Sequence, residues 1–185
     1  HAEYIVDRCA KLDPCQVVLM YGDRTTLFDK TRSNTVTEVL DKHPNIKVLA
    51  TVDGHWVVDK SMTAMSDVLT AHGDSIDVID SPSGDQQIMG AERVLKQRNV
   101  TRNIVLIGQG GGEFGISRVR EGAWAASLVL LPATMGRIAV DLAGKNLKGE
   151  QIPKIVNLMG QSPVGDWATP ESLKDHPEFK GEWTD

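Results

Sequence analysis

The stretch NIVLIGQGGGEFG, residues 103–115, joins an apolar run to a glycine-rich loop, and its interpretation decides the class of fold. Gly110, Gly112 and Gly115 satisfy the spacing G-x-G-x-x-G, which after a strand can cradle a phosphate. A dinucleotide site also needs an Asp or Glu at the end of the next strand, and that strand here ends in Leu130-Leu131-Pro132. No Gly-Lys-Ser/Thr triplet is present. We therefore interpret the loop as a turn that approaches a ligand or needs positive φ; a nucleotide-dependent enzyme is the less favoured alternative.

Apolar runs alternate with helical patterns on both sides of this loop. Strands are predicted at 16–21, 46–51, 76–80, 103–108 and 126–131, with a last strand at 153–158. Strands that are apolar throughout and separated by helices build a parallel sheet covered on both faces. The predicted fold class is therefore α/β, a parallel β-sheet with helices on both faces. Ligands of such sheets bind beyond the carboxyl ends of the strands.

A helix opened by Pro132 and ended by Gly149 carries an apolar stripe, formed by Met135, Ile138, Ala139 and Leu142. We expect this stripe either to fold back on the rest of the chain or to pair with a second copy in a homodimer.

The composition excludes several classes of protein. Of the 185 residues, 41% are hydrophobic and 24% charged, which is ordinary for a globular protein. The net charge of −5 argues against a nucleic-acid surface or an anionic membrane as partner. The longest apolar run, SLVLLPA, is too short to span a bilayer. The chain starts abruptly in a helical pattern without a signal peptide, which predicts a mature or truncated chain.

The residues that usually carry chemistry form no catalytic or metal pattern. No two of the five histidines have the i, i+4 spacing of a helical metal pair, and there is no G-x-S-x-G motif. We therefore predict no enzyme activity, no metal and no cofactor. Cys9 and Cys15 lie where the first helix gives way to the first strand. Both a buried apolar cysteine and a disulfide fit this position, and export would favour the disulfide.

Three longer segments resemble a known family. They are IKVLATVDGHWVVDKSMTAMSDVLTAHGD (46–74), GDQQIMGAERVLKQ (84–97) and VREGAWAASLVLLPATMGRIAVDLAGKNLKGEQIP (119–153). Together with IVLIGQGGG they resemble the type I periplasmic binding proteins, the sugar-type solute receptors of ABC importers, from Ala2 to about Val156. The cores of LacI-type transcription regulators share this fold, so the resemblance implies the fold more firmly than the role.

The resemblance implies two α/β lobes that close on a ligand. Residues 1–130 would be the C-terminal ligand-binding lobe, residues 131–160 a return helix and strand toward the other lobe, and residues 161–185 an extended tail. The implied function is a receptor for a small sugar-like, polyol or related polar solute. It would work in the periplasm or outside the cell, associated with the membrane permease of an ABC transporter and without nucleic acid.

The resemblance also assigns ligand-binding positions. Arg32 matches an arginine that donates to the ligand, and Trp56 matches the stacking aromatic residue. Gly110 stands where the family has an acidic ligand residue, whereas Asp85 keeps an acidic position and is also expected to cap its helix. The loss of three polar contacts, at Gly84, Gly110 and Leu130, suggests a smaller, deoxy, partly apolar or acidic ligand. The full candidate set is Arg32, Trp56, Ser83, Asp85, Gln109 and Gly110.

Overall fold

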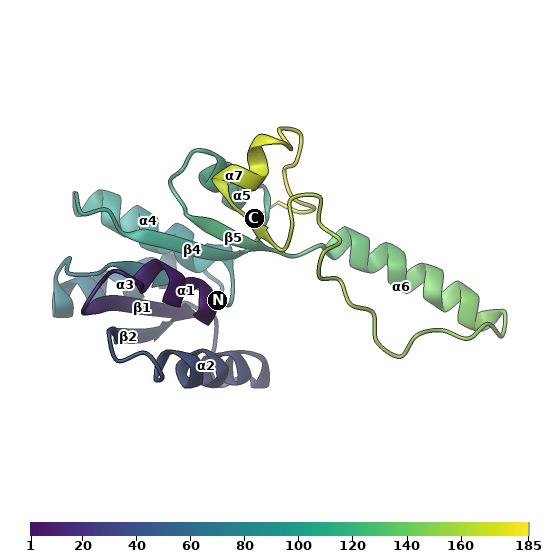
Figure 1. Cartoon of the computed structure of the whole chain (residues 1–185), viewed down its shortest axis with the longest axis horizontal. Coiled ribbons are helices and arrows are strands. Elements are labelled where there is room, and N and C mark those ends of the chain that lie inside the picture. The colour runs from purple at the N-terminus through teal and green to yellow at the C-terminus, as the bar shows by residue number, and fades with distance from the viewer. Residues whose placement is uncertain (185) are drawn as a thin grey trace.

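A computed structural model of the chain, described over residues 1–184, has a six-stranded sheet in the order β2-β1-β3-β4-β5-β6 (Figure 1). The first five strands are parallel, and β6 is antiparallel to β5 at the sheet edge. The strands are β1 (Cys15–Tyr21), β2 (Ile46–Asp53), β3 (Val78–Asp80), β4 (Val105–Gly110), β5 (Ala126–Val129) and β6 (Trp167–Ala168). The predicted α/β class is confirmed, with an antiparallel edge strand that the sequence analysis did not foresee.

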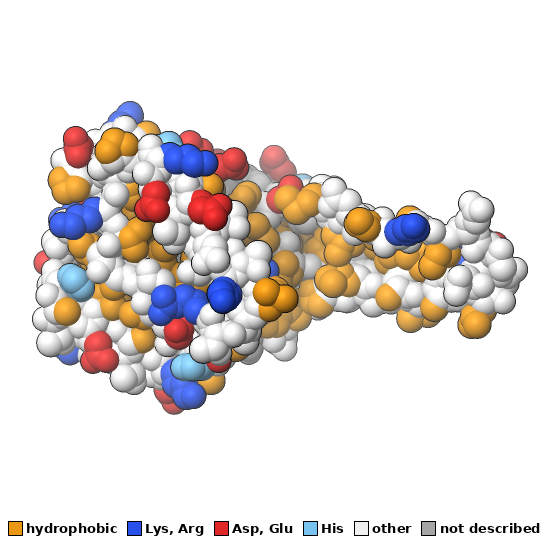
Figure 2. Space-filling view, turned by 90° about the horizontal axis from the view of Figure 1, so that it is seen from below, with side chains coloured by type: hydrophobic (Ala, Val, Ile, Leu, Met, Phe, Trp, Pro, Cys, Tyr) orange, Lys and Arg blue, Asp and Glu red, His pale blue; other side chains and the backbone are white. Residues whose placement is uncertain are grey.

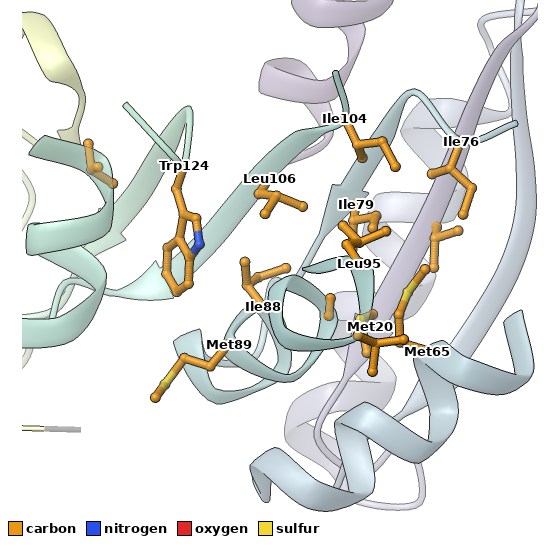
Figure 3. Close-up of a cluster of buried hydrophobic side chains, with 14 of the residues drawn as sticks. Met20, Met65, Ile76, Ile79, Ile88, Met89, Leu95, Ile104, Leu106 and Trp124 are labelled. Carbon is orange, nitrogen blue, oxygen red and sulfur yellow. The ribbon is translucent and has the colours of Figure 1, made fainter. Parts of the chain in front are cut away.

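Helices cover both faces of the sheet (Figure 1). The helices of the chain are α1 (Ala2–Cys9), α2 (Leu27–Leu40), α3 (Val58–His72), α4 (Asp85–Gln97), α5 (Glu113–Arg120), α6 (Pro132–Leu147) and α7 (Pro170–Lys174), of which α6 buries no residue against the sheet. The centre of β1 is apolar because both of its faces are covered: Val17 and Leu19 pack on the side of α1 and α2, whereas Val18 and Met20 pack with α3 and α4. Figure 3 shows part of this second, larger core, into which Ile88 and Trp124 project.

Helix α6 projects from the body of the molecule as an arm (Figure 1). None of its residues is buried, so the expectation that its stripe folds back on the body is wrong. Its apolar stripe instead lines an open groove of about 220 Å³ together with Val156 and Leu158. Figure 2 shows apolar side chains along this arm. The strand predicted at 153–158 is also wrong, because these residues are irregular and pair with no strand of the described chain.

The C-terminal region returns to the sheet. Residues 167–174 form β6 and α7, so the prediction of an extended tail over 161–185 is wrong for this part. Leu173 is buried in the main core, and the guanidinium of Arg120 donates to the carbonyls of Leu173 and Phe179, at 3.1 and 2.7 Å. These contacts hold the region against α5.

Cys9 and Cys15 form a disulfide, which settles the alternative that the sequence left open. Their Cα atoms are 5.5 Å apart, and both side chains are fully buried. The bond joins the end of α1 to the start of β1. None of the described helices has the length and apolarity that a membrane span requires.

Candidate ligand-binding site

The strand order places the candidate site at the carboxyl ends of β1, β3 and β4. The chain winds outward in one direction from β1 to β2 and in the other from β3 to β4, so a crevice opens where the direction changes. Buried polar side chains gather at this edge although the sheet around them is apolar: Asp29, Asp80, Ser81, Ser83, Asp85, Gln109 and Ser127. Burying a polar side chain is costly unless it is hydrogen-bonded. The gathering of several buried polar side chains at this edge therefore marks it as the candidate site.

Arg32 and Gln109 meet in a pocket of about 240 Å³, which is also lined by His1, Thr31, Thr35, Val36 and Pro82. The Arg32 guanidinium lies 3.6 Å over the ring of Phe28. In the orientation of the Gln109 amide that satisfies both of its ends, the amide oxygen accepts from Arg32 at 3.1 Å. The Gln109 amide nitrogen donates to the Pro82 carbonyl at 2.5 Å. Burial lowers the pKa of Arg32 from its usual value. Among the described residues Arg32 makes no ion pair, and the nearby Asp29 partly offsets the effect of burial on its pKa.

Trp56 bridges the ends of β1 and β3. It has a φ of 54°, and its indole lies so close to Gly22 that a Cβ there would be 2.0 Å from the ring. Its Nε1 donates to the Ser83 carbonyl at 3.2 Å, and the residue is 40% exposed. An indole fixed at both ends with part of its surface open can act as a stacking platform.

Ser83 and Asp29 support this edge from within. The Ser83 hydroxyl donates to Asp29 Oδ1 at 2.6 Å, and Asp29 Oδ2 accepts from the Asp23 backbone N–H at 2.7 Å. Ser83 is 8% exposed. The structure therefore uses the Ser83 side chain to tie the β3 loop to α2.

Asp85 is fully buried and holds the glycine loop. Its carboxylate accepts from the backbone N–H of Gly111 at 3.0 Å and from the Ser127 hydroxyl at 2.9 Å. A Cβ at Gly108 or Gly115 would lie 2.2 or 2.3 Å from its carboxylate oxygens. These glycines let the backbone close around Asp85, which explains this part of the pattern without a phosphate. The expected helix cap is wrong: Gly84 is the N-cap of α4, and Asp85 is its first residue.

Gly110 shows a neighbour that the sequence analysis missed. Its φ is 142°, and a Cβ there would lie 2.8 Å from Trp183 and 3.1 Å from Asp85. The Trp183 Nε1 donates to the Gly110 carbonyl at 3.1 Å. Trp183 lies in the segment that the sequence predicts to be an extended tail, and no local sequence pattern indicates that it contacts Gly110.

A buried carboxyl lies behind the pocket. Asp80 is fully buried, and its Oδ1 is 2.8 Å from Nδ1 of His1. Burial raises the pKa of the Asp80 carboxyl to about 8. Within residues 1–184, no group of three His, Cys, Asp or Glu side chains is arranged to hold a metal ion.

A covered parallel sheet with polar and aromatic side chains at its carboxyl edge defines a ligand-binding α/β lobe. Residues 1–151 match the family described as periplasmic binding protein domain, and the chain belongs to this family. The family and its relatives are solute-binding proteins and not enzymes.

Curated relatives are named as binding proteins, and a solved structure shares the fold. The chain is 26% identical to the ribose import binding protein RbsB of Haemophilus influenzae, over 76% of this chain and 46% of that protein. It is 25% identical to the xylitol-binding protein of Mycolicibacterium smegmatis, over 74% of this chain and 38% of that protein. A solute-binding protein of Actinobacillus succinogenes with bound D-allose has a TM-score of 0.82 at 19% identity, covering 95% of this chain and 58% of that one. The chain therefore spans about half the length of the curated relatives it matches.

Proposed function

We propose that this chain is the ligand-binding C-terminal lobe of an ABC importer receptor, and that it binds a small sugar-like or polyol solute at the carboxyl edge of its sheet. The observation that carries the proposal is that Arg32 and Gln109 line one pocket, although they are far apart in sequence. Trp56 lies at the same carboxyl edge, on the Ser83 carbonyl. A guanidinium and an amide donate to hydroxyls, and an indole stacks on an apolar sugar face. Ser83, Asp85 and Gly110 shape the backbone around them.

The lobe boundaries follow from the same proposal. Residues 1–130 form the ligand-binding lobe, and residues 131–160 carry the chain toward a second lobe that would cover the apolar groove on α6. The region after 160 returns to the first lobe. A receptor that closes on its ligand would then bury the solute between the two lobes.

The proposed partners are a solute and the permease of an ABC transporter, in the periplasm or outside the cell. The disulfide between Cys9 and Cys15 supports this location, because such bonds persist in oxidising compartments. The curated relatives described above are named as binding proteins for ribose and xylitol, which favours a transport receptor over a LacI-type regulator.

The test is a titration of the chain with D-ribose, xylitol, D-allose, myo-inositol and glycerol. Heteronuclear NMR monitors binding at ligand concentrations up to the millimolar range. Binding is expected to be weak, because one lobe offers only part of the contacts. Arg32→Gln should weaken binding about tenfold or more, since hydrogen bonds to a charged donor are strong. The matched control is Arg98→Gln, which removes an exposed arginine that contacts Ser66 far from the site.

NAD and ATP are the negative controls, because the glycine loop lacks the residues that hold a ribose or a phosphate. Binding of either nucleotide at micromolar concentration would overturn the receptor proposal. The receptor proposal would also be overturned if the Arg32→Gln variant and the Arg98→Gln control bound sugar with equal affinity.

A further inference from the structure

A buried pair of titratable side chains, His1 and Asp80, lies at the Arg32 pocket and has no part in the proposed function. The Nδ1 atom of His1, just before α1, lies 2.8 Å from Oδ1 of Asp80, the last residue of β3. The Asp80 side chain is fully buried, and that of His1 is 8% exposed. The imidazole also contacts the ring of Trp167 in β6 edge-on, with ring centroids 4.8 Å apart. These contacts fix the imidazole ring beside the pocket.

The other nitrogen of the His1 ring faces Gln109. When the Gln109 amide is oriented so that both of its ends are satisfied, its nitrogen donates to the Pro82 carbonyl and to His1 Nε2, at 2.5 and 3.3 Å. Its oxygen then accepts from Arg32 at 3.1 Å. His1, Gln109 and Arg32 all line the same pocket. A continuous row of hydrogen-bonding groups therefore runs from Asp80 through the imidazole and the amide to the guanidinium.

The number of protons on the His1–Asp80 pair decides whether this row is consistent. An imidazole nitrogen accepts a hydrogen bond only when it carries no proton. With one proton held between Nδ1 and the Asp80 carboxylate, Nε2 is free and accepts from the Gln109 amide nitrogen. With a second proton the pair is either imidazolium and carboxylate or imidazole and carboxylic acid. In both forms Nε2 carries a hydrogen, so two donors face each other.

Turning the Gln109 amide over does not remove this conflict. The amide oxygen would then face the Pro82 carbonyl, and the amide nitrogen would face the Arg32 guanidinium. One repulsive contact would be exchanged for two. The orientation of Gln109 is therefore fully satisfied only when His1 Nε2 is unprotonated.

The surroundings of Asp80 keep the second proton on the pair at neutral pH. Burial raises the pKa of the Asp80 carboxyl to about 8, and the amino group of His1 acts in the opposite direction. Within residues 1–184, Oδ2 of Asp80 has no hydrogen-bond partner, which disfavours a full negative charge on the carboxyl.

The other ionisable groups around the pair keep their charge through this range. From β1 the Tyr21 phenol interacts with Asp80, and it stays neutral because burial raises its pKa. Tyr21 also interacts with Arg24 and with Asp29 of α2. Asp29 is held by hydrogen bonds inside the lobe, and both Arg24 and Arg32 stay positively charged. A change in the hydrogen bonding of Gln109 over this range therefore reports the His1–Asp80 pair.

We propose that His1 and Asp80 form a proton-dependent positioning pair for Gln109. Once the pair has released one proton, the imidazole holds the amide with its oxygen toward Arg32; when the pair takes the proton back, the imidazole no longer accepts from the amide. The proton passes to water through the pocket that His1 lines. This inference rests on the proposed function, in which Gln109 and Arg32 bind the solute. Ligand affinity is therefore expected to rise as the pH increases through the titration of the pair.

The first measurement needs no ligand. Nitrogen NMR of the whole chain, across the neutral and mildly alkaline range, reports the protonation of both ring nitrogens of His1 and the side-chain amide of Gln109, assigned with Gln109→Ala. Nε2 is expected to lose its proton and the amide signal to shift with one common midpoint, at about pH 8. In His1→Gln the amide should no longer titrate. The control is His72→Gln, which removes an exposed histidine at the end of α3 and should leave the titration intact.

The second measurement titrates the chain with D-ribose and D-allose below and above this midpoint. Both probes are uncharged, so a change in the net charge of the pair has little direct effect on them. Affinity should be about fivefold tighter above the midpoint, the fold-change expected for one hydrogen bond between neutral groups. His1→Gln and Asp80→Asn should both remove this pH dependence, whereas His72→Gln keeps it. A purely structural role would weaken binding equally on both sides of the midpoint.

The outcomes separate this inference from the function on which it rests. If neither sugar binds at any pH while the Gln109 amide follows the titration of His1, the proposed function fails and the positioning pair stands. If sugars bind with an affinity that does not depend on pH, or if the amide ignores the titration of His1, the inference is overturned and the proposed function stands. An equal pH dependence in His1→Gln, or weaker binding above the midpoint, also overturns it. Should Asp80→Asn fail to fold, His1→Gln and the wild-type spectra decide.

Discussion

At the scale of single residues, the candidate site depends on glycines, which leave space that a side chain would otherwise fill. Gly108 and Gly115 leave room for the carboxylate of Asp85, and Gly110 leaves room for Trp183. One buried acid and one indole from distant parts of the chain therefore account for Gly108 and Gly110 in β4 and for Gly115 in α5. Two of the three glycines that match the nucleotide-loop spacing, Gly110 and Gly115, are thus explained by close packing of protein on protein.

We predict that restoring an acidic residue by Gly110→Asp destabilises the chain by about 2 kcal/mol, because of the strained φ of 142° and the crowding by Trp183 and Asp85. Adding Trp183→Ala should recover part of this loss, so that the two effects are not additive. Urea denaturation measures each variant. Gly160→Asp is the control, since Gly160 also has positive φ, at 77°, but open space around it. Equal losses at the two glycines, or strict additivity with Trp183→Ala, would contradict the packing argument.

At the scale of elements, the connection from α1 to β1 is fixed by cross-links rather than by the turn propensity of its own residues. The turn from α1 to β1 is closed by the disulfide and by Asn45, whose amide donates to the carbonyls of Cys9 and Leu12, at 3.1 and 3.0 Å. This keeps α1 on the face of the sheet where Ile5 is fully buried. The position of α1 in turn sets the wall of the pocket that His1 lines.

Replacing both Cys9 and Cys15 with Ala should lower the free energy of unfolding by about 2 kcal/mol, because a short closed loop then regains its freedom in the unfolded chain. Chemical denaturation with and without dithiothreitol measures the loss. The reductant should lower the stability of the wild type and leave the double variant unaffected. An unchanged midpoint in the double variant would show that the bond adds nothing to stability.

At the scale of the whole molecule, the arm formed by α6 and the residues after it leaves apolar surface uncovered. Met135 is 50% exposed and Ile155 is 85% exposed, in the region of the groove lined by Val156 and Leu158. Apolar surface in water costs about 25 cal/mol per Å², so a cover over this groove is favoured. A second lobe would provide it in a two-lobe receptor, and a second copy can provide it for the chain alone.

We predict that the chain by itself forms dimers through α6, seen by sedimentation equilibrium. Met135→Asp combined with Leu142→Asp should make it monomeric, because charges cannot be buried in an apolar contact without a partner. The control is Asp141→Ala with Lys145→Ala, which removes an exposed ion pair on the same helix and should leave the dimer intact. A monomeric wild type whose α6 amides exchange freely would contradict this prediction.

The order of apolar runs and helical patterns was enough to predict the α/β class, the five parallel strands and the six longer helices. That is because a strand buried on both faces must be largely apolar, as Val17 to Met20 of β1 show. The motifs of residues 46–74 and 119–153 also indicated the family to which the chain belongs. Arg32 could be named only through the resemblance to the family, whereas Trp56 and Gln109 also follow the ends of predicted strands; the ligand-binding role of all three stays a prediction.

Only the tertiary structure decided what lies beside those residues. The strand expected at 153–158 has no neighbouring strand to pair with, and β6 forms instead because β5 offers an unpaired edge to Trp167 and Ala168. The disulfide depends on a distance across a turn that spacing alone does not fix. Trp183 meets Gly110 across 73 residues of chain, and a contact of that range leaves no periodic trace in the sequence, because it is set by packing of the complete fold.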